Sequence, residues 1–237
     1  RTKCWNVFSF LYDREGNFWF GSCYEGVEFH PARSNFTCYA TRENDNSDRS
    51  KVVSAVCEIK EGHYLLGTEN NGILLFDKHD GTIVPYRTAQ NVGTAIYNVF
   101  SLLVDEQTLW IAAFQRGIEA IDMKSRAVKS YLSDPSDPSS RVFVLCQSSS
   151  GRIWAGTSVG LYYYDRLGDR FVAREPGVRI SDITEDHAGR LWIATNEDGL
   201  YAYDARTDRL RHYRYDPDDA STISRNAVNT LAVDRTN

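Results

Sequence analysis

The sequence lacks several features that define common classes of protein. No apolar run approaches the roughly 18 residues that span a bilayer, and no charged-then-apolar leader opens the chain. Lys and Arg number 27 against 32 Asp and Glu, so the net charge is −5 and a phosphate backbone would meet no concentrated positive charge. We therefore expect no nucleic-acid partner and no contact of this region with a membrane.

Cysteine and histidine patterns that bind metals are also missing. The chain has five cysteines and no C-x-x-C pair, at Cys4, Cys23, Cys38, Cys57 and Cys146. Each falls in or beside an expected strand, where a buried free thiol is the simplest interpretation. One bridge within a blade, Cys23 to Cys38, stays open. The five histidines are scattered singly, so we expect no metal site and no cofactor.

By contrast, aromatic residues are abundant and recur at fixed intervals. The chain has 14 Tyr, 11 Phe and 5 Trp. Anchor residues lie 38–46 residues apart, at Trp19, Leu65, Trp110, Trp154 and Trp192. Seven residues further on, or six in the fourth copy, stand the column glycines Gly26, Gly72, Gly117, Gly160 and Gly199. Five residues after each glycine come Pro31, Asp77, Asp122, Asp165 and Asp204. Three columns kept in register indicate an internal repeat.

Each copy has the pattern of four short strands joined by polar turns. No stretch shows sustained helical periodicity, so helices should be negligible. A four-stranded meander of this length cannot bury both faces alone, and radial stacking of such units makes a β-propeller. A β-sandwich would need no fixed Trp and Gly columns.

The sequence therefore predicts an all-β fold, with residues 1–237 as a single β-propeller region of four-stranded antiparallel blades. The expected blades are 5–48, 49–95, 96–137, 138–177 and 178–220, with a partial sixth at 221–237 that begins with the strand Asn229–Asp234. An open arc would expose apolar blade faces. We therefore expect the chain to belong to a larger ring or to associate with another copy.

Several segments resemble the two-component regulator propeller repeat. The resemblance is carried by Ile183–Thr195 followed by Asp198–Asp204, by Ile153–Thr157 with Gly160–Asp165, by Asn17–Gly21, and by the linker Asp216–Ser224. The second copy departs from the pattern, with Leu65 in place of Trp, and the third lacks the turn glycine before Trp110. These departures affect single blades.

This resemblance implies a sensor. Such repeats form the periplasmic part of hybrid two-component histidine kinases of Bacteroidetes, which are inner-membrane proteins that often respond to polysaccharide breakdown products. The ring would have roughly seven blades, and the kinase would lie across the membrane. No residues that could carry phosphotransfer are found here, so we expect no catalysis in this region.

Two other classes of function stay open. A propeller glycoside hydrolase or polysaccharide lyase needs only a few carboxylates that meet in space. A protein-interaction scaffold would bind partners and no small ligand. The pattern Gly156–Gly160 fits the G-x-S-x-G nucleophile elbow, but a strand that leads into another strand does not build that elbow.

Loops between second and third strands are the predicted ligand site. In a propeller they emerge at one face together with the connections between blades, and their tips vary while the strands repeat. An aromatic ring can stack on a sugar, and planar polar groups can pair with hydroxyls. The candidate residues for an oligosaccharide or other small ligand are Tyr24, Glu25, Glu69, Asn70, Phe114, Gln115, Arg116, Asn196 and Glu197.

Overall fold

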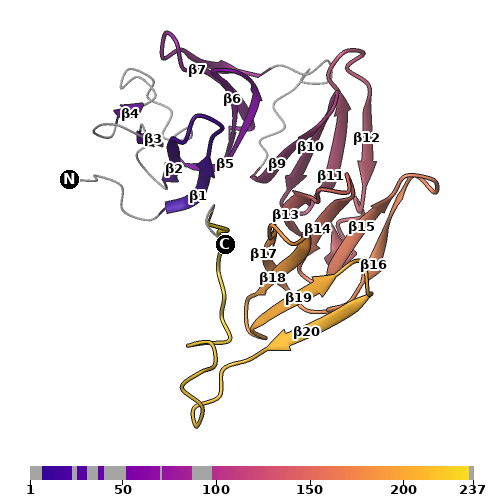
Figure 1. Ribbon diagram of the computed structural model, residues 1–237. Helices are drawn as coiled ribbons and strands as arrows, with labels where there is room; N and C mark the ends of the chain where they lie inside the picture. Colours follow the sequence, from indigo (N-terminus) through magenta and orange to yellow (C-terminus); the bar gives the residue numbers. More distant parts are fainter. Residues whose placement is uncertain are drawn as a thin grey trace. The chain divides into compact units, whose positions relative to one another are not determined.

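The computed structural model describes residues 7–22, 26–30, 37–39, 52–69, 71–86 and 98–234. They form five four-stranded sheets in which each strand pairs with the next strand along the chain (Figure 1). A single 3-10 turn, η1 (Pro138–Ser140), is the only helical element among these residues. The predicted all-β fold, a β-propeller of four-stranded antiparallel blades, is confirmed.

The chain divides into two compact units, residues 1–114 with 120–129, and residues 115–119 with 130–237. The first and second sheets belong wholly to the first unit, and the boundary passes through the third sheet. These three sheets consist of β1 (Val7–Tyr12), β2 (Phe18–Ser22), β3 (Gly26–His30) and β4 (Thr37–Tyr39); β5 (Val53–Lys60), β6 (His63–Thr68), β7 (Ile73–Asp77) and β8 (Ile83–Pro85); and β9 (Val99–Asp105), β10 (Thr108–Ala113), β11 (Gly117–Asp122) and β12 (Val128–Tyr131).

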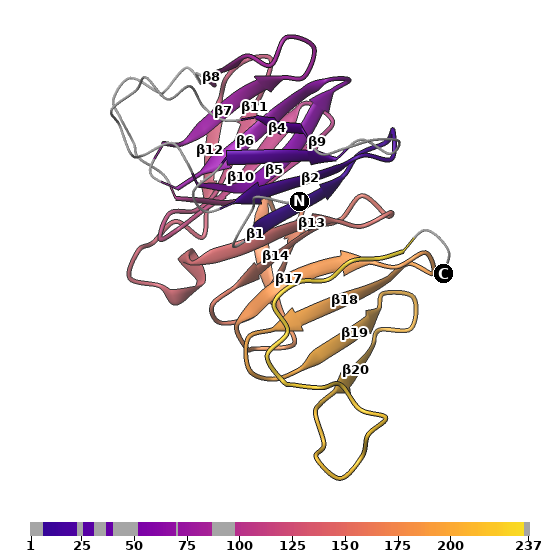
Figure 2. The ribbon, with the colours of Figure 1, turned by 90° about the vertical axis from the view of Figure 1, so that its left-hand side faces the viewer.

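The fourth and fifth sheets belong to the second unit, and their colours run from salmon to golden orange in Figure 2. They consist of β13 (Val142–Gln147), β14 (Ile153–Thr157), β15 (Leu161–Asp165) and β16 (Arg170–Arg174); and of β17 (Ile180–Glu185), β18 (Arg190–Thr195), β19 (Leu200–Asp204) and β20 (Arg209–Tyr213). Among the residues described, no helix is long and apolar enough to cross a membrane.

The anchor residues lie on second strands, and most of them are buried between sheets. Trp19 is fully buried against Tyr64 and Phe76 of the second sheet, at ring-centroid distances of 4.4 and 5.7 Å. Trp154 is 1% exposed and packs on Tyr203 of the fifth sheet. Trp192 is only half-buried. The sequence pattern does not distinguish Trp192 from the other anchors, because burial depends on whether another blade covers that face.

Two of the five cysteines can be described fully, and both are free. Cys57 and Cys146 lie half-buried on the first strands of their blades. This agrees with the expectation that the cysteines in strands are unpaired. Cys4 and Cys23 lie outside the described residues, so the alternative of a Cys23–Cys38 bridge stays untested.

The segment Val228–Leu231, close to the end of the chain, lies against β17. Figure 2 shows this part of the chain as a yellow trace beside the orange strands. The Ser181 hydroxyl donates to the Val228 carbonyl, as Ser54 does to Val99 at the contact between the second and third sheets. Asp182 accepts hydrogen bonds from the Thr230 hydroxyl at 2.9 Å and from the Leu231 amide at 2.7 Å. The segment thus occupies the position of a sixth blade's first strand. It forms no strand of its own, because the described residues supply no second strand to pair with it.

Candidate functional site

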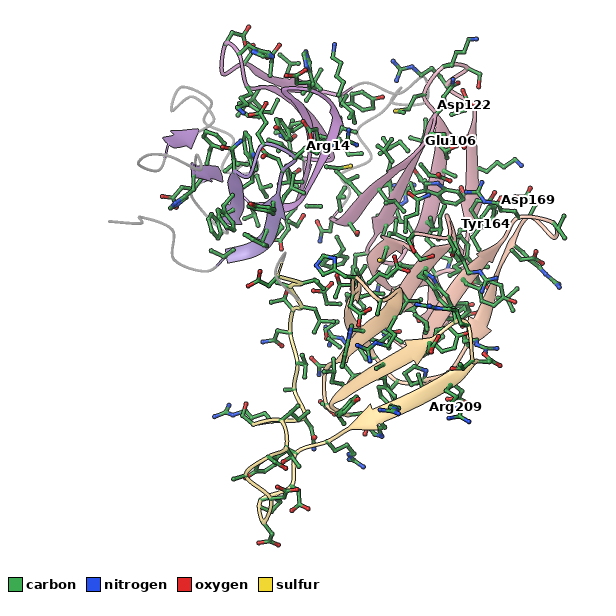
Figure 3. The ribbon with its side chains drawn as sticks, in the orientation of Figure 1. Arg14, Glu106, Asp122, Tyr164, Asp169 and Arg209 are labelled. Carbon is green, nitrogen blue, oxygen red and sulfur yellow. The ribbon has the colours of Figure 1, made fainter. Side chains whose placement is uncertain are left out.

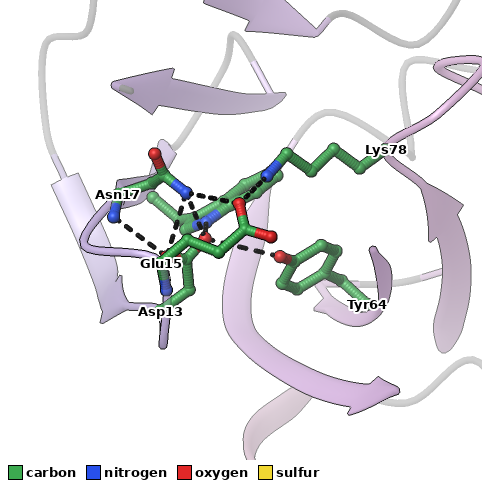
Figure 4. Close-up of polar contacts among 6 residues, drawn as sticks. Asp13, Glu15, Asn17, Tyr64 and Lys78 are labelled. Atoms are coloured by element: carbon green, nitrogen blue, oxygen red, sulfur yellow. Dashed lines mark hydrogen bonds and ion pairs between the residues drawn. The ribbon is translucent and has the colours of Figure 1, made fainter. Parts of the chain in front are cut away.

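In the first blade the aspartate of the turn before the anchor caps the backbone of that turn. Asp13 Oδ1 accepts from the backbone amides of Glu15 and Asn17 at 3.0 and 2.9 Å (Figure 4). Asp13 Oδ2 also accepts from the Trp19 indole at 2.9 Å. Burial raises the pKa of Asp13, but the hydrogen bonds from Trp19 and Asn17 outweigh it and lower that pKa. The carboxylate therefore serves to hold the anchor ring in place.

The fifth blade repeats this arrangement. The Trp192 indole donates to Asp186 Oδ2 at 2.9 Å, and Arg190 pairs with the same carboxylate at 2.9 Å. Burial opposes ionisation of Asp186, but hydrogen bonds from Arg190 and Trp192 lower its pKa to about 2. Sequence reasoning missed the indole bond, although the spacing of six residues between Asp and Trp in both blades could have indicated it.

The fourth blade has Ser148 where the other two have Asp, and its anchor lacks the acceptor. Trp154 Nε1 is buried with no hydrogen-bond partner in the part of the chain that the structure describes. We expect Ser148→Asp to supply one and to stabilise the fold by about 1 kcal/mol. A guanidinium titration against Ser148→Ala, which adds no acceptor, checks this. Equal stability of the two variants would contradict it.

The predicted loop residues are only partly visible. Tyr24, Glu25 and Asn70 lie outside the described residues. In the first unit, Glu69 is half-buried, and the exposed Phe114 ring lies 5.9 Å from the Phe100 ring in an edge-on arrangement.

The loop residues of the second unit are on the surface. Gln115 and Arg116 are exposed, and Gln115 has a positive φ of 57°. Asn196 donates from its side chain to exposed Glu197 at 3.3 Å. Asn196 and Glu197 are therefore brought together within one loop tip. A role of any of these nine residues in ligand binding stays a prediction.

The position of these loops within each blade agrees with expectation. The residue that begins each described loop donates its backbone N–H to the carbonyl just before the blade's first strand. These bonds are Glu69 to Val52 at 3.1 Å, Phe114 to Asn98 at 3.0 Å, Ser158 to Arg141 at 3.0 Å and Asn196 to Arg179 at 3.2 Å. Loops from the second to the third strand and connections between blades therefore lie at the same end of a blade.

The G-x-S-x-G pattern is a turn between two strands, β14 and β15, as the sequence suggested. Ser158 Oγ donates to the Pro138 carbonyl at 2.6 Å rather than meeting a histidine. Burial raises the pKa of Cys57 to about 11 and that of Cys146 to about 12, so neither thiol is ionised near neutral pH. Over the described ranges no three His, Cys, Asp or Glu side chains are placed to hold a metal ion.

A groove in the second unit is the feature that sequence reasoning missed. Its volume is about 610 Å³, within the range typical of small-molecule sites. It lies where strands of the fourth and fifth sheets end, and its lining includes Val159, Tyr162, Arg174, Glu175, Tyr203, Asp208 and Leu210.

Three side chains join the two sheets inside the groove. Arg174 of β16 forms an ion pair with Asp208, which precedes β20. The Tyr203 hydroxyl donates to Asp208 Oδ1 at 2.9 Å, and the Arg174 guanidinium lies 5.3 Å from the Tyr203 ring centroid. One signal in the sequence could have drawn attention to this place. Arg174 interrupts a column of tyrosines, Tyr86, Tyr131 and Tyr213, at the end of the fourth strand.

Comparison with known proteins agrees with the repeat pattern. Residues 136–159 and 174–197 match the family described as two component regulator propeller. A search of curated proteins finds no match.

Solved structures share the fold at low sequence identity. One is the extracellular domain of a proposed hybrid two-component system from B. thetaiotaomicron, with 17% identity and a TM-score of 0.76, covering 95% of this chain and 31% of that one. A second such domain from B. thetaiotaomicron has 18% identity and a TM-score of 0.63, covering 97% of this chain and 36% of that one. Virginiamycin B lyase from Staphylococcus aureus has 13% identity and a TM-score of 0.67, covering 90% of this chain and 71% of that one.

The present chain thus spans about a third of the length of the two bacterial extracellular domains. Its fourth and fifth blades contain the matched segments. The chain is therefore a β-propeller in which two segments, in the fourth and fifth blades, are similar to the two component regulator propeller repeat.

Proposed function

We propose that this chain is part of the extracytoplasmic ligand-sensing domain of a hybrid two-component histidine kinase, and that it responds to polysaccharide breakdown products. The observation that carries the proposal is the family match in the fourth and fifth blades. The shared fold with extracellular domains of proposed two-component systems supports it. The region would lie in the periplasm as part of an inner-membrane protein, with the kinase in a segment outside this chain.

A sensor binds its ligand and releases it unchanged. The described residues suit this role, because their turn carboxylates are engaged with indoles and backbone amides and their thiols are un-ionised. The two alternatives make different predictions. A glycoside hydrolase or polysaccharide lyase would consume the glycan, and an interaction scaffold would bind no small ligand.

Incubating the 237-residue chain with enzymatic digests of plant and host polysaccharides separates these functions. We expect at least one digest to raise the melting temperature of the chain, since a ligand that binds only the folded state stabilises it. Assays of reducing ends and of unsaturated products should show no change over the same period. Sustained turnover would establish an enzyme, and a melting temperature unmoved by every digest would refute sensing by this chain.

The partner that we propose for the exposed sheet face of the first blade is another blade of the same repeat. Phe18 is 40% exposed, whereas Tyr64, which also directly precedes its anchor, is 1% exposed beneath Trp19. The Phe18 ring stacks with that of Phe10 at 5.5 Å and lies tilted against that of Tyr12 at 4.8 Å. This aromatic face therefore has the character of a blade interface without its cover.

A second copy or a neighbouring part of a longer ring could supply the covering blade. We expect the isolated chain to self-associate as its concentration rises, and the double variant Phe10→Thr, Phe18→Thr to do so less. Thr keeps the strand propensity while it removes the rings. Light scattering after size exclusion provides the measurement. A monomer at every concentration would show that the face needs no partner.

A further inference from the structure

The groove lies at a junction where the end of one blade's fourth strand, β16, meets the β19–β20 hairpin of the next blade. The equivalent junction between the end of β12 and the β15–β16 hairpin is filled by side chains. In the filled junction Tyr131 ends β12, and Tyr164, Asp169 and Phe171 come from the fourth blade. The three rings lie 5.4–5.6 Å from one another. Both tyrosine hydroxyls donate to Asp169 Oδ1, at 2.6 and 2.7 Å (Figure 3 labels Tyr164 and Asp169). Aromatic side chains thus occupy the space at this junction.

The groove has the same four positions with two different residues. Tyr164 and Tyr203 each stand four residues after a column glycine, and they pair across their hairpins with Phe171 and Leu210. Asp169 and Asp208 are the positive-φ residues of those hairpin turns. The differences are therefore Arg174 in place of Tyr131 and Leu210 in place of Phe171. Each exchange removes an aromatic ring from the junction, and the groove lies where those rings would be.

A third junction, in the first unit, is also filled. Its equivalent residues are Tyr86, Ile121, Arg126 and Val128. Ile121 is 2% exposed, and Tyr86 and Val128 pack against the same cluster. The Arg126 guanidinium covers the Tyr86 ring at 5.5 Å and donates to its hydroxyl at 3.0 Å. Side chains therefore fill two of the three junctions compared, and the groove is a local departure from that packing.

The charges in the groove restrict what it can bind. Arg174 contributes one positive charge, whereas Asp208 and Glu175 contribute two negative charges, and the arginine is already paired with Asp208. An anionic ligand would find no uncompensated cation here. Carboxylates accept hydrogen bonds from hydroxyl groups, and a guanidinium has five N–H donors. Arg174 uses only Nη2 in its bonds to Tyr203 and Asp208.

Part of the remaining lining is apolar and accessible. Val159 is 39% exposed and Leu210 is 36% exposed. Gly177, at the same edge, has only the Val159 carbonyl within 4 Å of the place where a Cβ would stand. The groove therefore presents hydrogen-bonding groups beside aliphatic surface, an arrangement that suits the polar edges and the C–H faces of a carbohydrate.

We propose that this groove binds a neutral, hydroxyl-rich ligand of the chemical class of a short uncharged saccharide. The inference rests on the proposed sensing function and assigns it a site in the second unit. Asp208 and Glu175 would accept hydrogen bonds from hydroxyls, Arg174 would donate, and Leu210 and Val159 would contact the C–H face.

The test refills the groove with the residues that the repeat itself uses. In the double variant Arg174→Tyr, Leu210→Phe both rings of the filled junction are restored. Calorimetry with cellobiose, xylobiose and mannobiose, and with digalacturonate as the anionic probe, measures binding. We expect the wild-type chain to bind at least one neutral disaccharide, and to bind digalacturonate at least about tenfold more weakly. The double variant should lose at least about tenfold in affinity for that disaccharide.

A matched control comes from the filled junction. Phe171→Leu makes there the exchange that Leu210 represents in the groove, and it should leave disaccharide affinity unchanged. Thermal melts of each variant establish that it is folded.

Three results would overturn the assignment: equal affinity of a folded double variant and the wild type, preference for digalacturonate, or no binding of any neutral probe. The digest screen judges the sensing function separately. A digest that stabilises the wild type and the refilled variant equally would place the ligand elsewhere in a working sensor.

Discussion

Replacing Trp19 with alanine is expected to lower the free energy of unfolding by about 3–5 kcal/mol, the usual range for removing a buried Trp side chain. Trp19 is fully buried and its ring contacts Phe29, Tyr64 and Phe76. Its indole also donates to Asp13, so the variant leaves a buried carboxylate without one of its donors. The effect combines a cavity between two sheets with an unsatisfied polar group. Urea or guanidinium titration followed by far-ultraviolet circular dichroism measures it.

The neighbouring residue supplies the control. Phe18 precedes Trp19 on β2, and its side chain is 40% exposed on the other face of the sheet. Phe18→Ala removes a large ring from the same strand without opening a cavity, and we expect it to cost less than about 1 kcal/mol. If both variants lost a similar amount, the contact of Trp19 with the second sheet would not be the main source of stability.

The fold could be predicted because its determinants are local and repeated. Anchor and glycine residues recur at intervals that a four-stranded meander requires, and every anchor lies on the second strand of its blade. The partial exposure of Trp192 does not follow from its own segment, which resembles that of Trp154, but it agrees with the expectation that an open arc exposes a blade face. The two residues differ in whether another blade covers the ring: Trp154 packs on Tyr203 of the next blade, whereas Trp192 is only half-buried.

The groove escaped prediction for a related reason. Arg174 and Asp208 are 34 residues apart and belong to different blades. Their meeting becomes visible only when the fourth strands are aligned in register, so that Arg174 falls in a column with Tyr131. Loop tips were chosen instead because they vary while the strands repeat. Variation inside a strand column was the more informative signal at this place.

Replacing a column glycine with alanine tests why glycine recurs at that position of the repeat. The reason is either the positive φ alone or also the backbone atoms that lie where a Cβ would stand. Gly199 has a φ of 84°, and an added Cβ would stand 2.3 Å from the Tyr213 carbonyl oxygen. Backbone cannot yield as a flexible side chain can, so the pairing of β19 with β20 would have to open. We expect Gly199→Ala to cost about 3 kcal/mol or more, from the left-handed conformation and from lost backbone hydrogen bonds.

Gly151 separates the two contributions within the same unit. Its φ is 77°, close to that of Gly199, but an added Cβ would meet nothing within 4 Å. Gly151→Ala should therefore show the conformational cost alone, about 1 kcal/mol. Denaturant titration of the two variants gives the difference directly. A difference near zero would mean that the positive φ alone accounts for the glycine, whereas a gap of about 2 kcal/mol would assign the rest to the Tyr213 carbonyl that closes over Gly199.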